Sequence, residues 1–283
     1  MRIASLQPSV TIILDRLGCL EPSAPSPACE LVACTRYCLA AVPALRNRPI
    51  GPGFTIVRDS WSTTHDELLA LHPDLVIASV PYRNESLAAI LRAGCPVLAL
   101  APHSLADIAQ DIRLIAAVAG LPAQGERLVA DLQDAVAQMR RYTADLRSRP
   151  RVYCEEWGKP LIHSQLWVRE LVEAAGGLFI GEPGAVTTPE AIAEADPDVI
   201  LAAWCGAADR VPLEKLAARP GWSQLRAIRD GRLYCIADEL LNTPAPTLID
   251  GLRAIASALH PDTFGTSVGL RALARNPTVP IGV

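Results

Sequence analysis

The sequence has very few lysines. Lys159 and Lys215 are the only ones among 26 Lys and Arg residues. We attribute this imbalance mainly to genomic composition, although arginine also suits bidentate contacts with anions. Positive charge is also scarce overall, since the formal net charge is −4 and no run of basic residues occurs. We therefore expect neither a nucleic acid nor an anionic membrane as a partner.

Long hydrophobic runs are missing as well. A membrane span needs roughly 18 to 20 uninterrupted apolar residues, but proline, charged or polar residues break every apolar run here. The first strand candidate is followed at once by Gln7-Pro8-Ser9, which does not resemble an export signal. We therefore expect no direct membrane insertion and a cytoplasmic location, or an extracytoplasmic one if the true start lies upstream.

The cysteines form no recognisable framework. They lack any C-x-x-C pair, and the spacing of the four between positions 19 and 38 fits no common structural zinc site. The eight cysteines stand at positions 19, 29, 34, 38, 95, 154, 205 and 235. This pattern favours reduced thiols, most of them small buried residues, in a reducing compartment.

Motifs of common catalytic sites are absent. The chain has no G-x-G-x-x-G or G-x-x-x-x-G-K-[ST] loop and no H-E-x-x-H metal motif. Gly265-Thr266-Ser267-Val268-Gly269 matches the nucleophile elbow of hydrolases, but no aspartate, glutamate or histidine follows it to complete a triad. We therefore expect no catalytic residue, no enzyme activity, no metal site and no cofactor.

The apolar content predicts a globular α/β protein. Half of the residues are hydrophobic, and a length of 283 residues favours two lobes over one. Continuous apolar runs at 74–79 and 198–203 indicate buried strands covered by helices on both faces. The expected architecture is two Rossmann-like lobes with mainly parallel sheets, joined by a single long backbone helix.

That helix is expected where apolar residues recur at helical spacing from Ala123 to Leu146, before Ser148-Arg149-Pro150 ends the pattern. It would be about 35 Å long, since each helical residue adds about 1.5 Å. The predicted division is an N-terminal lobe at 1–122, a connecting helix at 123–147, a C-terminal lobe at 148–262 and a tail at 263–283.

The two lobes share a repeated pattern. Thr64-His65-Asp66 and Pro73-Asp74 recur as Thr188-Pro189-Glu190 and Pro197-Asp198, at a constant offset of 124 residues. Pro-Asp before aliphatic residues is common in α/β proteins. The acidic residue at the same upstream distance in both copies nevertheless favours a duplicated lobe.

Aromatic residues make up only 5% of the chain, yet several follow predicted strands. Ligands of open α/β sheets bind beyond the carboxyl ends of the strands, and ring faces there suit a flat, largely apolar ligand. Each ring alone is more often an edge of the core, but together they favour one cleft. The residues in such positions are Tyr37, Trp61, Tyr82 with Arg83, Trp157 and Trp204.

Segments along nearly the whole chain resemble the class III periplasmic binding proteins, which deliver cobalamin, haem and ferric siderophores to ABC importers. These segments are Arg2 to Ser9, Thr35-Arg36-Tyr37-Cys38, Pro73 to Ala78, Arg151-Val152-Tyr153 with Glu156-Trp157, Trp167 to Gly177, Arg219-Pro220-Gly221-Trp222, Gly231 to Tyr234 and Asp250-Gly251-Leu252. The cobalamin branch is the most similar, because of residues 35–38 and the aromatic residues.

The resemblance implies a monomer that binds a metal-chelate tetrapyrrole, first of all cobalamin or another corrinoid, in a cleft between two lobes. Haem and ferric siderophores are the alternative ligands. Trp167 and the aromatic residues above would contact the ring system, while Arg83, Glu156 and His163 would meet its polar side groups. Asp66 and Glu190 would dock onto the membrane subunits of an ABC importer, although an acid in the first turn also suits the helix dipole.

Two further readings stay open. A cytoplasmic chelatase-like enzyme could use His163 and Glu156 as acid and base, and a corrinoid sensor could pass its ligand to another protein. Cys38, Cys154 and Cys205 adjoin the predicted ligand loops, so one of these thiols or His163 could coordinate the ligand's metal. Small residues packed beneath the loops are the more common role for such cysteines.

Overall fold

The computed structural model describes residues 1–20, 29–51, 53–80, 84–92 and 94–273. They form two compact units. Unit 1 comprises Met1–Gln133 with Pro244–Pro246, and unit 2 comprises Asp134–Thr243 with Thr247–Val283. Within the described part of the chain, no helix is both long and apolar enough to cross a membrane.

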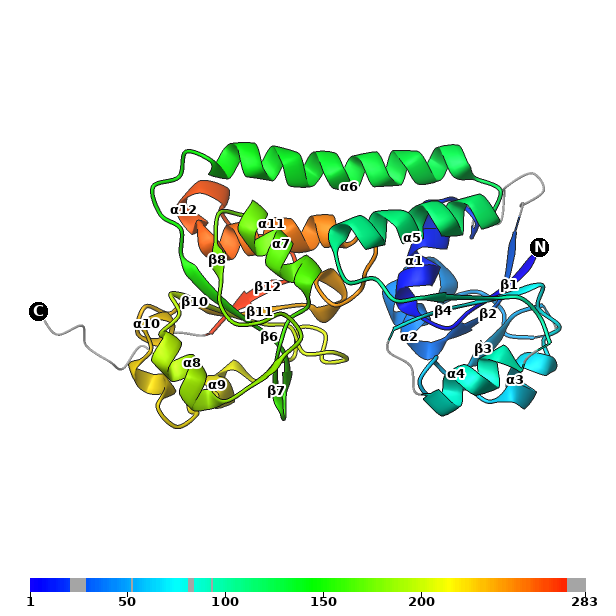
Figure 1. Cartoon of the computed structure of the whole chain (residues 1–283), viewed down its shortest axis with the longest axis horizontal. Coiled ribbons are helices and arrows are strands. Elements are labelled where there is room, and N and C mark those ends of the chain that lie inside the picture. The colour runs from blue at the N-terminus through cyan, green and yellow to red at the C-terminus, as the bar shows by residue number, and fades with distance from the viewer. Residues whose placement is uncertain (21–28, 52, 81–83, 93, 274–283) are drawn as a thin grey trace, which may run out of the picture. The chain divides into compact units, whose positions relative to one another are not determined.

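Unit 1 contains a five-stranded, wholly parallel sheet in the order β3-β2-β1-β4-β5. Its strands are β1 (Arg2–Ser5), β2 (Glu30–Thr35), β3 (Thr55–Val57), β4 (Leu75–Ser79) and β5 (Val97–Leu100). Its helices are α1 (Pro8–Arg16), α2 (Arg36–Ala41), α3 (His65–Leu69), α4 (Asn84–Leu91) and α5 (Leu105–Val118), with a 3-10 turn at Pro43–Leu45. Helices α1 and α5 cover one face of the sheet and α3 and α4 the other (Figure 1).

The sequence explains this layering. Every residue of β4 is buried, as expected for a central strand between two helical layers. On one face, Val76 and Ala78 pack with Leu68 of α3 and Ile90 of α4. The predicted parallel α/β lobe is therefore present in unit 1.

Unit 2 contains a mixed sheet in the order β12-β11-β10-β6-β7-β9, with β8 paired to β6. The parallel pairs are β8–β6, β6–β10 and β10–β11. The antiparallel pairs are β6–β7, β7–β9 and β11–β12. The strands are β6 (Arg151–Gly158), β7 (Leu161–His163), β8 (Leu178–Phe179), β9 (Val186–Thr187), β10 (Val199–Ala202), β11 (Leu233–Ile236) and β12 (Leu270–Ala272). Strand β12 lies in the predicted tail and adds an edge to this sheet, while residues 274–283 lie outside the described residues.

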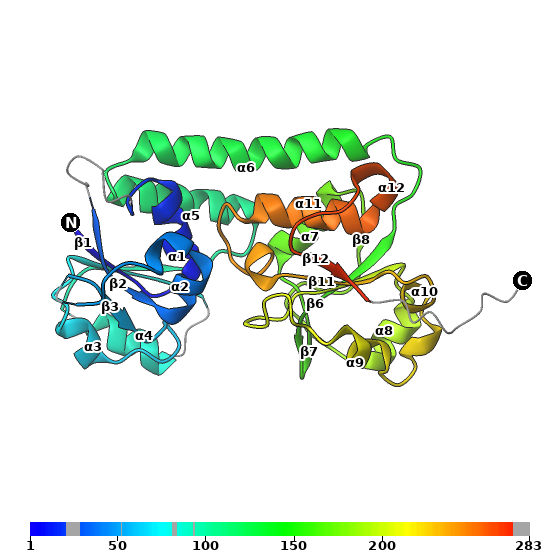
Figure 2. The same ribbon diagram turned by 180° about the vertical axis from the view of Figure 1, so that it is seen from behind.

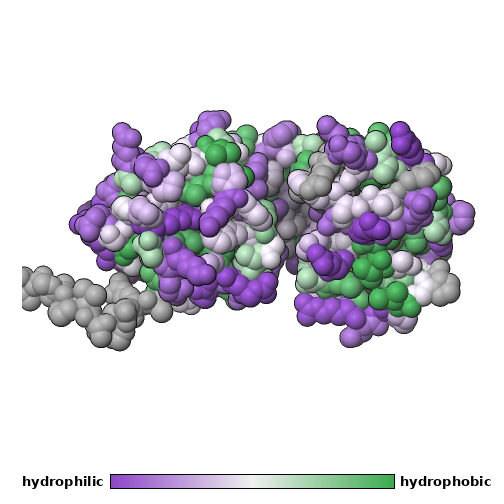
Figure 3. Space-filling model, turned by 90° about the horizontal axis from the view of Figure 1, so that it is seen from below, coloured by the Kyte–Doolittle hydropathy of each residue, from purple (hydrophilic) through white to green (hydrophobic). Residues whose placement is uncertain are grey.

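The helices of unit 2 are α7 (Leu166–Ala174), α8 (Pro189–Ala195), α9 (Leu213–Ala217), α10 (Arg226–Arg229), α11 (Leu248–Leu259) and α12 (Pro261–Phe264), with 3-10 turns at Trp222–Gln224 and Asp238–Leu240. The long helix α6 (Pro122–Thr143) begins in unit 1 and continues into unit 2 (Figure 2). It ends before the predicted residue 147, where the Thr143 hydroxyl donates to the carbonyls of Met139 at 3.1 Å and Ala174 at 2.9 Å. Seen from below, the surface of each unit mixes hydrophobic and hydrophilic residues (Figure 3).

The repeat seen in the sequence is also a structural repeat. In unit 1 the Asp74 carboxylate accepts a 2.7 Å hydrogen bond from the backbone N of Arg2, at the start of β1. In unit 2 the Asp198 carboxylate accepts the equivalent 2.8 Å bond from Arg151, at the start of β6. The two units thus use the same aspartate to align the first strand of the sheet with its neighbour.

Candidate functional site

A cavity of about 800 Å³ opens in unit 2 beyond the carboxyl ends of β6 and β10. Trp157 and Trp204 line it, together with aliphatic residues such as Leu161 and Leu216. A mostly apolar wall with two indoles, in a cavity of this size, is typical of a small-molecule site. The structure therefore brings two of the predicted aromatic residues together.

The Trp204 ring is held firmly at this wall. Its Nε1 donates a 2.8 Å hydrogen bond to Glu155 Oε1. The ring also lies against Gly158, where any Cβ would collide with it, so a residue without a side chain is needed there. Trp157 is freer: it is 44% exposed and its Nε1 donates to the Lys159 carbonyl at 2.8 Å.

A buried ion pair supports the cavity wall. Glu155 is fully buried and accepts hydrogen bonds from Arg219 Nη1 at 2.6 Å and Nη2 at 2.8 Å. The Tyr153 hydroxyl donates to the same carboxylate at 2.9 Å. Burial, and then the nearby carboxylate, raises the pKa of Tyr153, so this hydroxyl keeps its proton. Because every oxygen of the pair is hydrogen-bonded, the network fixes Arg219 and Trp204 in place.

The charged side chains lining the cavity are cations. Lys159, in the turn between β6 and β7, and Lys215, on α9, line it together with Arg219. Arg219 is paired with Glu155, whereas neither lysine forms an ion pair with any residue that the structure describes. The cavity therefore carries net positive charge.

Glu156 and Cys205 form a second polar cluster beside this wall. The Glu156 carboxylate accepts from Gln165 Nε2 at 2.8 Å and from the Cys205 thiol at 3.7 Å. Burial raises the pKa of Glu156. Desolvation of the sulfur atom, followed by the nearby Glu156 carboxylate, raises the pKa of Cys205. Cys205 lines the cavity, but at neutral pH it is a protonated thiol rather than a ready thiolate ligand.

The other metal-coordination candidates are not at the cavity. Cys38 belongs to unit 1 and is fully buried, and Cys154 is a buried residue of β6. Among the described residues, no group of three or more His, Cys, Asp or Glu side chains could hold a metal ion.

His163 and Trp167, two residues predicted to meet the ligand, are buried in the core of unit 2. The His163 ring stands edge-on to Tyr153, with centroids 5.2 Å apart, and Gly181 covers it so closely that a Cβ there would collide with the ring. Burial lowers the pKa of His163. The Trp167 Nε1 donates to the Leu241 carbonyl at 2.7 Å. These side chains serve packing in this structure and do not line the cavity.

In unit 1, the predicted aromatic residues follow two adjacent strands. Strands β2 and β3 pair as far as Thr35 and Val57. Tyr37 and Trp61 come shortly after these residues and are 41% and 40% exposed. Tyr82 and Arg83 lie outside the described residues.

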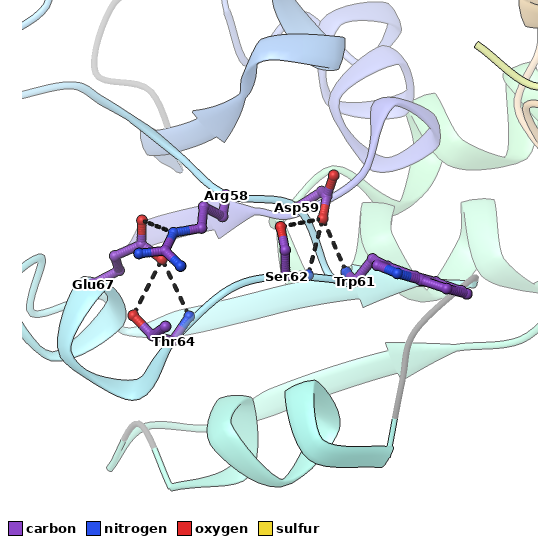
Figure 4. Close-up of polar contacts among 6 residues, drawn as sticks. All are labelled: Arg58, Asp59, Trp61, Ser62, Thr64 and Glu67. Atoms are coloured by element: carbon purple, nitrogen blue, oxygen red, sulfur yellow. Dashed lines mark hydrogen bonds and ion pairs between the residues drawn. The ribbon is translucent and has the colours of Figure 1, made fainter.

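Asp59 builds the loop that presents Trp61 (Figure 4). Its Oδ1 accepts from the backbone N of Trp61 at 3.1 Å, from the backbone N of Ser62 at 3.0 Å and from the Ser62 hydroxyl at 2.8 Å. The indole points away from this turn, while Arg58 pairs with Glu67 on its other side (Figure 4). The loop therefore offers an exposed ring on a hydrogen-bonded base.

Asp66 and Glu190 occupy equivalent places in the two units. Asp66 is in the first turn of α3, after Thr64, and Glu190 is in the first turn of α8, after Thr188. Both acids are exposed. The Thr188 hydroxyl caps its helix by accepting from the backbone N of Ala191 at 3.2 Å.

A family model described as periplasmic binding protein matches residues 3–240. The chain belongs to the periplasmic binding protein family. This confirms the resemblance and agrees with the two-lobed α/β fold. The family is one of substrate-binding proteins rather than a class of enzymes.

Curated relatives are similar over part of their length. The chain is 27% identical over 213 residues to an ABC transporter substrate-binding lipoprotein of Bacillus subtilis (strain 168), covering 70% of this chain and 66% of that protein. It is also 27% identical over 213 residues to a cobalamin-binding protein of Halobacterium salinarum (strain ATCC 29341 / DSM 671 / R1), covering 71% of this chain and 57% of that protein. Less than two thirds of each relative is therefore matched.

A solved structure matches more completely. The periplasmic heme-binding protein RhuT from Roseiflexus sp. RS-1, in apo form, superposes with a TM-score of 0.75 at 25% identity. The match covers 93% of this chain and 98% of that one. This binding protein thus shares the fold of that heme-binding protein along almost its whole length.

The cytoplasmic location predicted from the sequence is wrong. The family is described as periplasmic, and the Bacillus subtilis relative is a lipoprotein, so an extracytoplasmic location is indicated. The prediction relied partly on the unpaired cysteines. Six of the eight are buried, however, and burial protects a thiol from oxidants in any compartment.

Sequence reasoning missed the cations of the cavity. The sequence pattern singles out Arg219 only within the segment Arg219-Pro220-Gly221-Trp222, and the two lysines only through their rarity. Their convergence depends on the path of the β6–β7 turn and of α9, which periodicity does not predict. The rarity of lysine was the one available signal.

Proposed function

We propose that this periplasmic binding protein carries a flat metal-chelate tetrapyrrole, with cobalamin or another corrinoid as the first candidate and haem as the second. The observation that carries the proposal is the cavity of about 800 Å³ with Trp157 and Trp204 in its wall. The Halobacterium relative is named for cobalamin and the Roseiflexus structure for heme, which supports this ligand class.

The chemistry of the cavity suits binding better than catalysis. The Glu155 carboxylate is fully occupied by Arg219, Trp204 and Tyr153, and His163 is buried beneath Gly181. Neither is placed to move a proton on a ligand in the cavity. Insertion of ferrous or cobalt ions into a metal-free tetrapyrrole by the purified protein would contradict a pure carrier.

Calorimetric titration with cyanocobalamin, haemin and a ferric hydroxamate siderophore tests the ligand class. We expect saturable one-to-one binding of a tetrapyrrole with Kd below about 1 μM, equivalent to about 8 kcal/mol. Trp157→Ala should weaken it at least about tenfold, because a stacked ring contributes about 0.5 to 1.5 kcal/mol beyond the area it buries. Tyr142→Ala, which removes an exposed ring that does not line the cavity, is the matched control. Binding of the siderophore alone would contradict the proposal.

We further propose that Asp66 and Glu190 contact the membrane subunits of an ABC importer. Their equivalent positions and their exposure support this role, since an acid placed only for the helix dipole need not recur in both units. Asp66→Arg and Glu190→Arg should each reduce stimulation of the importer's ATPase in proteoliposomes and leave ligand affinity unchanged. Asp131→Arg, the same charge reversal on the exposed side of α6, should have no effect.

A further inference from the structure

The only two lysines of the chain both line the same cavity. They come from different elements, Lys159 from the turn after β6 and Lys215 from α9. The protein as a whole is acidic, with a formal charge of −4. A local excess of positive charge at an apolar cavity therefore stands out against the rest of the chain.

These ammonium groups are available to a ligand. No residue that the structure describes forms an ion pair with either lysine. Of the two carboxylates nearby, Glu155 is held by Arg219, Trp204 and Tyr153. The half-buried Glu156 accepts from Gln165 and Cys205. A bound ring would remove part of the water around each ammonium group. This loss of solvation costs free energy unless the ligand itself supplies an anion as a partner.

We propose that the ligand presents ionised carboxylates to Lys159 and Lys215, so that this cavity selects acid-bearing tetrapyrroles over those that carry only amides. This inference rests on the proposed function and, within its ligand class, favours haem and acid-bearing corrinoids over cobalamin, whose corrin side groups are amides. Neutral amides would also hydrogen-bond to lysine, but charge-assisted bonds to a carboxylate are about twice as strong.

A matched pair of corrinoids tests the selection. Dicyanocobyrinic acid carries carboxylates where dicyanocobinamide carries amides, on the same ring and the same metal. We expect the wild-type protein to bind the acid at least about tenfold more tightly at low salt, and this preference to shrink in 0.5 M NaCl because exposed charges are screened. Haemin, which has two propionates, is the third probe.

The variant Lys159→Gln/Lys215→Gln should abolish the preference, because it should weaken binding of the acid much more than binding of dicyanocobinamide. Arg140→Gln/Arg141→Gln removes the same charge from α6, away from the cavity, and should preserve the preference. Equal affinity of the wild type for both corrinoids, or a preference that survives loss of the lysines, would overturn this inference and leave the proposed function standing. Absence of binding to either corrinoid and to haemin would overturn both.

Discussion

The two units place different chemistry near the end of the first strand of their sheets. In unit 1, β1 ends at Ser5, whose buried hydroxyl forms a 2.7 Å hydrogen bond with the Thr11 hydroxyl. In unit 2, β6 carries Glu155, whose buried carboxylate binds Arg219, Trp204 and Tyr153. The two units therefore differ near the end of the first strand: the buried groups there are neutral in unit 1, whereas unit 2 has a buried carboxylate.

This difference explains how each unit holds its aromatic residues. Trp204 is tied to the buried carboxylate and packed against Gly158, so its ring is fixed. Trp61 is carried by a loop that Asp59 caps through backbone and hydroxyl contacts, which leaves the ring itself 40% exposed. The two units therefore hold these residues differently: Trp204 is fixed through its own ring nitrogen, and Trp61 through the backbone of its loop.

Breaking the buried pair should have the largest effect. Glu155→Ala leaves the half-buried Arg219 without its anion and should lower the free energy of unfolding by about 3 kcal/mol. Ser5→Ala in unit 1 removes the neutral hydrogen bonds to the Thr11 hydroxyl and the Gln7 carbonyl and should cost about 1 to 2 kcal/mol. Urea unfolding followed by circular dichroism measures both. Arg113→Ala, which breaks the exposed pair with Glu126, serves as a control that should cost under about 1 kcal/mol. Equal costs for all three variants would contradict the comparison.

A glycine substitution in each unit should give the next largest contrast. Gly18 (φ +85°) and Gly181 (φ +89°) both have left-handed backbone, so alanine is strained by about 1 to 2 kcal/mol at either site. At Gly181 the new Cβ would also collide with the His163 ring, whereas at Gly18 nothing lies within 4 Å of it. Gly181→Ala should therefore cost about 2 to 5 kcal/mol in all. Thermal unfolding midpoints compare the pair, and similar shifts would show that the His163 ring can move aside.

The sequence predicted some elements of the fold and not others. Periodicity predicted the parallel sheet of unit 1 and the long helix, because buried strands and an amphipathic helix have strong local patterns. The short strands of the unit 2 sheet were not predicted, because they are only two or three residues long. These strands are β7, β8, β9 and β12. Such short strands depend on tertiary pairing rather than on a local pattern.

The candidate site was predicted in part for the same reason. Trp157 lies near the end of β6 and Trp204 follows β10. These two strands are neighbours in the sheet, so topology alone brings the two rings together. His163 also lies at a strand end, but the backbone of Gly181 covers it. Lys215 and Arg219 reach the cavity from irregular segments and α9, whose path the local sequence does not determine.

The repeated aspartates allow a finer comparison. Asp74 and Asp198 each accept a backbone hydrogen bond from the first residue of a strand, but Asp198 also pairs with Arg226 Nη1 at 2.7 Å. Asp198→Ala should therefore cost about 2 kcal/mol and Asp74→Ala about 1 kcal/mol in the free energy of unfolding. Chemical denaturation of the two variants measures the difference. A larger cost at Asp74 would mean that the ion pair with Arg226 adds nothing.

The smallest expected effect is a pH dependence that arises in unit 2. Burial lowers the pKa of His163 and of His260, so the unfolded chain binds protons below about pH 6.5 while the folded chain does not. The free energy of unfolding should therefore fall as the pH drops through 6.5, by at most about 1.4 kcal/mol per pH unit for each histidine. Glu156 acts in the opposite direction to the histidines. Burial raises its pKa, so the folded state takes up that proton first and gains stability as the pH falls toward about 4.5.

Urea unfolding at pH 7.5, 6.5 and 5.5 measures how the free energy of unfolding changes with pH. His260→Gln, whose amide can still donate to the Ala175 carbonyl that His260 Nε2 contacts at 3.1 Å, should make the slope shallower. An unchanged slope in this variant would assign the pH dependence to groups other than His260.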